Sequence, residues 1–122
     1  MLILIAGPYR SNTNDNPELI AQNMHRMEEA ALTVYRAGHT PICGEWIALP
    51  LIQQAGSTQV GDTVFNEIFH PVAVRLIDHC DAVLRVGGPS AGADEMMNQA
   101  ALKGKQTYWA MENLPVASVS SV

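Results

Sequence analysis

Residues 80–105 read CDAVLRVGGPSAGADEMMNQAALKGK, and this stretch decides the fold that we expect for the whole chain. Its apolar run, residues 82–86, is short and branched, which predicts a buried strand. A turn of small or conformationally restricted residues follows at 87–92. Residues 93–103 are then rich in helix formers, and Gly104 stands where a helix stop belongs.

A strand, a glycine-rich turn and a helix leave free backbone N–H groups at the helix N-terminus, which suits an anion. The turn matches neither the G-x-G-x-x-G nor the G-x-x-x-x-G-K-[ST] fingerprint. Asp94 and Glu95 fall in the first turn of the predicted helix, where the helix dipole keeps a carboxylate ionised. Such a group suits a nucleophile or a base, and it suits ordinary capping equally well.

The rest of the chain alternates strands and helices. A helix begins at Asn16-Pro17, with asparagine as its cap, and ends at Gly38. Residues 47–54 are a helix or an irregular segment broken by Pro50. Strands are predicted at 2–6, 40–43 and 106–111, and a helix from Asp62 to Phe69. Pro71 starts or kinks the next segment, which runs to His79. The domain is expected to span residues 1–113, followed by a tail at 114–122. This alternation predicts an α/β fold with a parallel sheet of four or five strands and helices on both faces.

In sheets of this type, ligands bind beyond the carboxyl ends of the strands. Right-handed crossovers bring those ends together, so the loops 7–16, 44–46 and 87–95 are expected around one site. Three side chains of these loops each allow two roles. Arg10 is either a phosphate partner or a solvated surface residue, and Trp46 either stacks on a base or packs against the protein. Tyr9 either orients a carboxylate or caps the end of the strand. The candidate substrate-binding residues are Gly7, Pro8, Arg10, Ser11, Trp46, Gly88, Ser90 and Gly92.

Composition limits the class of protein. The chain has 122 residues, enough for one domain, and a net charge of −5 without a basic cluster, which argues against a nucleic-acid polymer as partner. The four histidines lack metal-ligand spacing, so no metal site is expected. Cys43 and Cys80 favour two buried thiols over a disulfide. No apolar run approaches membrane-spanning length, and we expect a cytoplasmic protein without a membrane partner.

The motifs I-A-G-P-Y-R, C-D-A-V-L and P-S-A-G-A-D-E, in this order, resemble the nucleoside 2-deoxyribosyltransferase-like superfamily, in particular its small bacterial branch of uncharacterised proteins. The resemblance covers residues 2–109. It implies a flavodoxin-like three-layer sandwich, a homo-oligomer, and cleavage or exchange of the N-glycosidic bond of a nucleotide or nucleoside without a cofactor. It implies Glu95 as the nucleophile, oriented by Tyr9. Asp94, in the same helical turn, is a further candidate catalytic acid from the residues alone.

Three positions depart from the family's pattern. The family's glutamate stands four residues after the turn glycine, where this chain has Met96. Ser90 resembles the branch of nucleotide hydrolases, in which a serine serves the phosphate, and Ala73 replaces an expected acid. These features favour a 5′-monophosphate as substrate. Two alternatives stay open: a non-catalytic nucleotide-binding or sensing module, and a phosphoribohydrolase of the cytokinin-activating kind, suggested by Gly87-Gly88.

Overall fold

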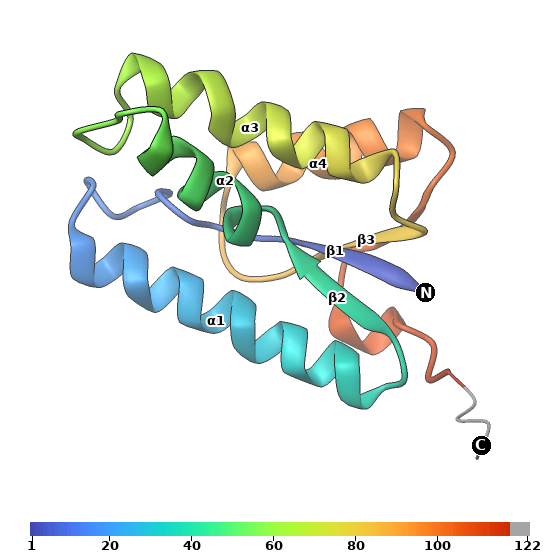
Figure 1. Cartoon of the computed structure of the whole chain (residues 1–122). Coiled ribbons are helices and arrows are strands. Elements are labelled where there is room, and N and C mark those ends of the chain that lie inside the picture. Colours follow the sequence, from blue (N-terminus) through green and yellow to red (C-terminus); the bar gives the residue numbers. More distant parts are fainter. Residues whose placement is uncertain (118–122) are drawn as a thin grey trace.

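A parallel four-stranded sheet lies at the centre of residues 1–117, which are the part of the chain that the computed structural model describes (Figure 1). Its strands are β1 (Leu2–Ala6), β2 (Thr40–Cys43), β3 (Ala82–Arg85) and β4 (Gln106–Tyr108). The order across the sheet is β2-β1-β3-β4, and every neighbouring pair is parallel. The connections after β1 and β3 therefore leave in opposite directions from adjacent strands, which creates the crevice where such sheets bind ligands.

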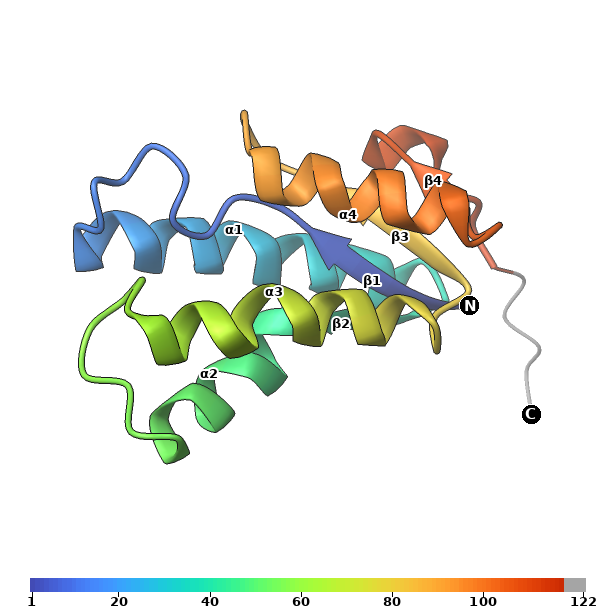
Figure 2. The ribbon, with the colours of Figure 1, turned by 90° about the horizontal axis from the view of Figure 1, so that it is seen from above.

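Helices cover both faces of the sheet. These are α1 (Pro17–Arg36), α2 (Gly44–Gln54), α3 (Thr63–Ile77) and α4 (Ala91–Leu102). Figure 2 shows α3 and α4 side by side over one face, with α1 on the other side of the sheet. The predicted α/β fold is confirmed, and the arrangement is consistent with a flavodoxin-like sandwich.

Alternation along β1 divides the core between the two faces. Ile3 and Ile5 pack with Met27 and Val34 of α1, whereas Leu4 packs with the residues of α3 and α4. Successive strand side chains point to opposite faces, so one continuous apolar run supplies both halves of the core. The strand predicted at 2–6 is confirmed, and Ile3, Leu4, Ile5 and Ala6 are all buried.

Side-chain caps define where the helices begin. The Asn16 side chain accepts hydrogen bonds from the N–H groups of Glu18 and Leu19, at 2.9 and 3.4 Å, and Asp62 accepts one from Phe65 N–H at 2.8 Å. Asn16 was predicted as a cap, and the other helix was predicted to start at Asp62. Ser90 caps α4, so that this helix begins at Ala91, two residues earlier than predicted.

Two prolines do not interrupt their helices. Pro50 lies inside α2 and Pro71 inside α3, each of which runs as a single helix. Ala48, Ile52 and Phe65 form a shared core between α2 and α3. This packing offsets the loss of one backbone hydrogen bond per proline, so tertiary contacts override the local signal. Residues 44–46, which were expected in a loop, form the first turn of α2.

The chain after β4 returns to the α1 side of the sheet. A 3₁₀ helix at Met111–Asn113 leads to Leu114, which is buried in the core, and Ala117 N–H donates to Ala37 O at 2.9 Å. The first part of the predicted tail therefore packs on the domain, and its remainder, 118–122, lies outside the described residues. The strands are shorter than predicted, since β3 ends at Arg85 and β4 at Tyr108.

Both cysteines are buried free thiols, as the sequence favoured. None of the helices in residues 1–117 has the length and apolar character needed to cross a bilayer.

A substitution at Gly87 tests how the conformation of the turn after β3 is stabilised. Its φ is +77°, and a Cβ there would come within 2.7 Å of Pro8 Cδ, whereas a Cβ at Gly88 would meet nothing within 4 Å. We predict that Gly87→Ala lowers the free energy of unfolding by about 1–3 kcal/mol. Gly88→Ala is the matched control, with a change within about 0.5 kcal/mol in urea unfolding. Equal effects of the two substitutions would contradict this account of the turn.

Candidate functional site

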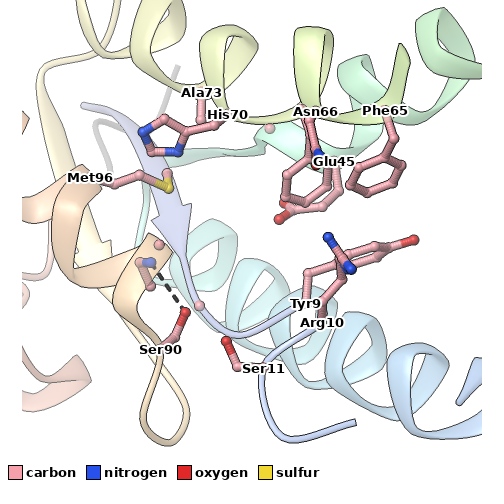
Figure 3. Close-up of a pocket in the computed structure, with 15 residues that line it drawn as sticks. Tyr9, Arg10, Ser11, Glu45, Phe65, Asn66, His70, Ala73, Ser90 and Met96 are labelled. Carbon is pink, nitrogen blue, oxygen red and sulfur yellow. Dashed lines mark hydrogen bonds between the residues drawn. The ribbon is translucent and has the colours of Figure 1, made fainter. Parts of the chain in front are cut away.

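A pocket of about 240 Å³ opens where β1, β2 and β3 end (Figure 3). The loop after β1, the first turn of α2, one face of α3 and the start of α4 all contribute to it. The three predicted loops therefore do meet at one site. The lining residues are Gly7, Tyr9, Arg10, Ser11, Gly44, Glu45, Phe65, Asn66, Phe69, His70, Ala73, Ser90, Gly92, Ala93 and Met96.

Glu45 is the carboxylate of this pocket. It is the second residue of α2, directly after β2, and only 9% of it is exposed. Within the described chain, its side chain forms no hydrogen bond or ion pair with another side chain, and its carboxyl group faces the cavity in Figure 3. Burial raises the pKa of Glu45 from 4.5 to about 7, although its own backbone N–H favours the charged form. A group with this pKa can both give and accept a proton near neutral pH.

Three aromatic rings form one wall of the pocket. Phe65 stacks on Phe69 with 4.8 Å between ring centroids, and Tyr9 lies 5.2 Å from Phe69. Burial raises the pKa of the Tyr9 phenol, and the negative charge of Glu45 raises it further. Tyr9 and Glu45 thus interact electrostatically. The aromatic wall beside them is an apolar surface on which a flat ring can stack.

Arg10 lies at the aromatic end of the pocket. Its Nε and Nη2 donate to the two carboxylate oxygens of Asp15, at 2.8 and 2.9 Å, and its guanidinium lies 5.5 Å from the centroid of Phe65. The ion pair raises the pKa of Arg10 and lowers that of Asp15. Gly61 makes room for Arg10, because a Cβ there would overlap the guanidinium. Arg10 therefore lines the pocket, but its charge is already paired.

The opposite end carries Ser11, Ser90 and the N-terminus of α4. Ser90 is only 7% exposed, and its Oγ accepts a hydrogen bond from Ala93 N–H at 3.1 Å. Ser11 lines the same pocket. Gly92 leaves the helix start uncovered, since a Cβ there would meet nothing within 4 Å. The first N–H groups of a helix have no intrahelical partner, so this end favours a negatively charged group.

The two acids predicted as catalytic lie elsewhere. Glu95 is exposed, accepts a hydrogen bond from Gln99 Nε2 at 2.9 Å and does not line the pocket. Asp94 binds Arg85 instead, with 2.9 Å between Oδ1 and Nε. Met96, one residue beyond Glu95, lines the pocket, because each residue turns a helix by about 100°. The structure therefore does not bring Glu95 and Tyr9 together at this site.

Three other predicted residues also lie outside this pocket. Trp46 is 41% exposed and donates through Nε1 to Glu28 Oε2 of α1 at 2.9 Å, which agrees with a packing role. Pro8 and Gly88 line a separate cavity beside the first loop, together with Arg26 of α1.

Sequence reasoning missed Glu45 and the contribution of α3. Asn66, Phe69, His70 and Ala73 lie on one face of α3 and enter the pocket at helical spacing. The available signal for Glu45 was its place directly after a strand, in a loop already expected at the site. Among residues 1–117 there is no group of three or more His, Cys, Asp or Glu side chains arranged to hold a metal ion.

The buried carboxyl of Glu45 predicts a specific pH dependence of stability. Its pKa is about 7 in the folded chain against an ordinary 4.5, so the folded state holds the extra proton between these values. Stability is therefore lost as the pH rises from about 4.5 to 7, by about 3 kcal/mol. Glu45→Gln removes this loss, and the difference between variant and wild type in urea unfolding at pH 5 and pH 8 measures it. A difference that does not change with pH would contradict the burial of a protonated Glu45.

Comparison with family models and with curated proteins gives no match for the chain. A scan against models of protein families finds none that matches. A search of curated proteins likewise finds no relative of the chain. The chemistry of the pocket must therefore be read from its own residues and their geometry.

Proposed function

We propose that the pocket binds a small nucleoside 5′-monophosphate and that the chain cleaves or exchanges its N-glycosidic bond there, with Glu45 as the working carboxylate. The observation that carries this proposal is the buried carboxyl of Glu45, which forms no ion pair within residues 1–117. It lies between an aromatic wall and the N-terminus of a helix. Such a convergence of an apolar surface, an anion-binding end and one group of perturbed pKa is typical of small-molecule enzymes.

The two ends of the pocket suit the two ends of a nucleotide. Phe65, Phe69 and Tyr9 offer ring surfaces for the base. The start of α4 offers backbone N–H groups and the hydroxyl of Ser90 to the phosphate, and the positive end of the helix dipole favours its negative charge. A single phosphate needs only a few local donors, so a net charge of −5 is compatible with a mononucleotide.

Glu45 can serve both halves of the reaction. In its protonated form it gives a proton to the base nitrogen as the C–N bond breaks and the bonding electrons leave with the base. The resulting carboxylate stabilises the positive charge that develops on the sugar. It then accepts a proton from the water, or from the second base, that adds to the anomeric carbon. The pKa of about 7 suits a group that must exist in both forms at neutral pH.

The resemblance to the nucleoside 2-deoxyribosyltransferase-like superfamily supports the proposal and stays a prediction. Its fold agrees with the parallel sheet found here, and Tyr9, to which the resemblance gives an orienting role, lines the pocket. The homo-oligomer, the cytoplasmic location and the lack of a cofactor also stay predictions. In this proposal Glu45, as a proton donor and acceptor, replaces Glu95, which the resemblance implies as a nucleophile.

A binding module without turnover is the second candidate. Met96 favours it, because a thioether lines the pocket at the position where the resembled family has its glutamate. A chain of this kind keeps the aromatic wall and the anion end but lacks a nucleophile. Calorimetry showing tight binding of a nucleoside 5′-monophosphate, with no release of free base, would choose this candidate over the enzyme.

Base release tests the enzyme directly. We predict that the pure protein liberates free base from one or more common nucleoside 5′-monophosphates, as measured by chromatography. Glu45→Gln should lower the rate by about 10²–10⁴-fold, because it can neither give nor accept the proton. Glu95→Gln is the matched control, an exposed glutamate outside the pocket, and should stay within about twofold of wild type. Equal rates for wild type and Glu45→Gln would contradict the assignment.

A further inference from the structure

Arg85 is a buried cation that the proposed reaction does not use. It is the last residue of β3, paired in register with Ala6, and only 8% of it is exposed. A charged side chain is rarely placed so deep unless it is fully paired, because its desolvation is costly. Its partners therefore indicate what the charge is for.

Within residues 1–117, the hydrogen-bond partners of the Arg85 guanidinium all belong to the turn after β3 and to the helix that follows it. Nη1 donates to Val86 O and Nη2 to Gly88 O, the latter at 2.8 Å. Nε donates to Asp94 Oδ1 at 2.9 Å. A single planar guanidinium thus joins two carbonyls of the turn to a carboxylate in the first turn of α4. This fork geometry is specific to arginine.

Asp94 would otherwise oppose an anion at this end of the pocket. Its backbone N–H donates to Ser90 O at 3.0 Å, so the carboxylate lies one helical turn from the capping serine. About half of the Asp94 side chain is exposed, 52% by area. A negative charge here disfavours a second negative charge at the start of the helix, unless a cation balances it.

We propose that Arg85 is the positioning residue of the phosphate end: it holds the turn before Ser90 and balances Asp94, and the pocket thereby prefers a phosphorylated nucleoside to the free nucleoside. This inference rests on the proposed function, since it concerns the same pocket. Arg85 does not line the pocket, so it acts through the turn and Asp94 rather than by touching the ligand.

A purely structural role makes a different prediction. If Arg85 only stabilised the fold, its loss would weaken the binding of nucleoside and nucleoside 5′-monophosphate by the same factor. The positioning role affects the phosphate alone. The ratio of the two dissociation constants, which we call the phosphate preference, therefore separates the two roles.

The experiment measures the phosphate preference by calorimetry for wild type, Arg85→Gln, Arg85→Lys and Asp94→Asn. The ligands are the common nucleosides and their 5′-monophosphates. Arg85→Gln should lower the phosphate preference at least about tenfold, and Arg85→Lys should recover only part of it, because lysine restores the charge without the fork. Asp94→Asn should raise the preference about two- to fivefold and make it more sensitive to salt, since Arg85 then carries an unbalanced charge.

An unchanged phosphate preference in folded Arg85→Gln, or an equal loss for both ligands, would overturn the inference. If Arg85→Gln does not fold, Asp94→Asn decides, because its exposed side chain can be replaced without loss of core packing; no rise in preference then overturns it. The wild type tests the proposed function separately: a protein that binds neither nucleosides nor their 5′-monophosphates refutes that function, whatever the variants do.

Discussion

The placement of the Glu45 carboxyl is the constraint on which the rest of this site depends. α2 begins directly where β2 ends, and its first turn packs against α3, which leaves Glu45 with 9% of its surface exposed. The cost of burying the charge appears as a raised pKa. Burial raises the pKa of Tyr9 and that of Cys43, which reaches about 12, and the Glu45 carboxylate raises both further. Glu45 thus contributes to the electrostatics of its neighbours at the sheet edge.

The fold was largely predictable from the sequence because its main signals are local. The runs at 2–6 and 82–86 are apolar enough to be buried on both faces. Asn16 and Asp62 are residues that commonly cap helices, and each marks the start of one. The prolines at 50 and 71 were wrongly expected to interrupt their helices. α2 and α3 stay continuous because they pack against each other. Local rules describe the cost of a proline but not the packing that offsets it.

The site was predictable in location and less so in detail. Strand order alone brings the three loops together, and Tyr9, Ser11, Ser90 and Gly92 all line the pocket. Glu45 was missed because its burial depends on α3, which lies well downstream. An acid in a first helical turn, such as Glu95, looks the same in sequence whether it faces solvent or a cavity. Only the register of α4 on the sheet distinguishes it from Met96.

A nuclear magnetic resonance titration of the Glu45 side-chain carboxyl carbon tests the central claim most directly, with Glu45→Gln used to assign the signal. We expect the carboxyl to titrate near pH 7 in the free protein and its resonance to shift when a nucleoside 5′-monophosphate is added. A carboxyl that titrates near its ordinary pKa of 4.5 and does not respond to the nucleotide would contradict the assignment of this pocket as the functional site.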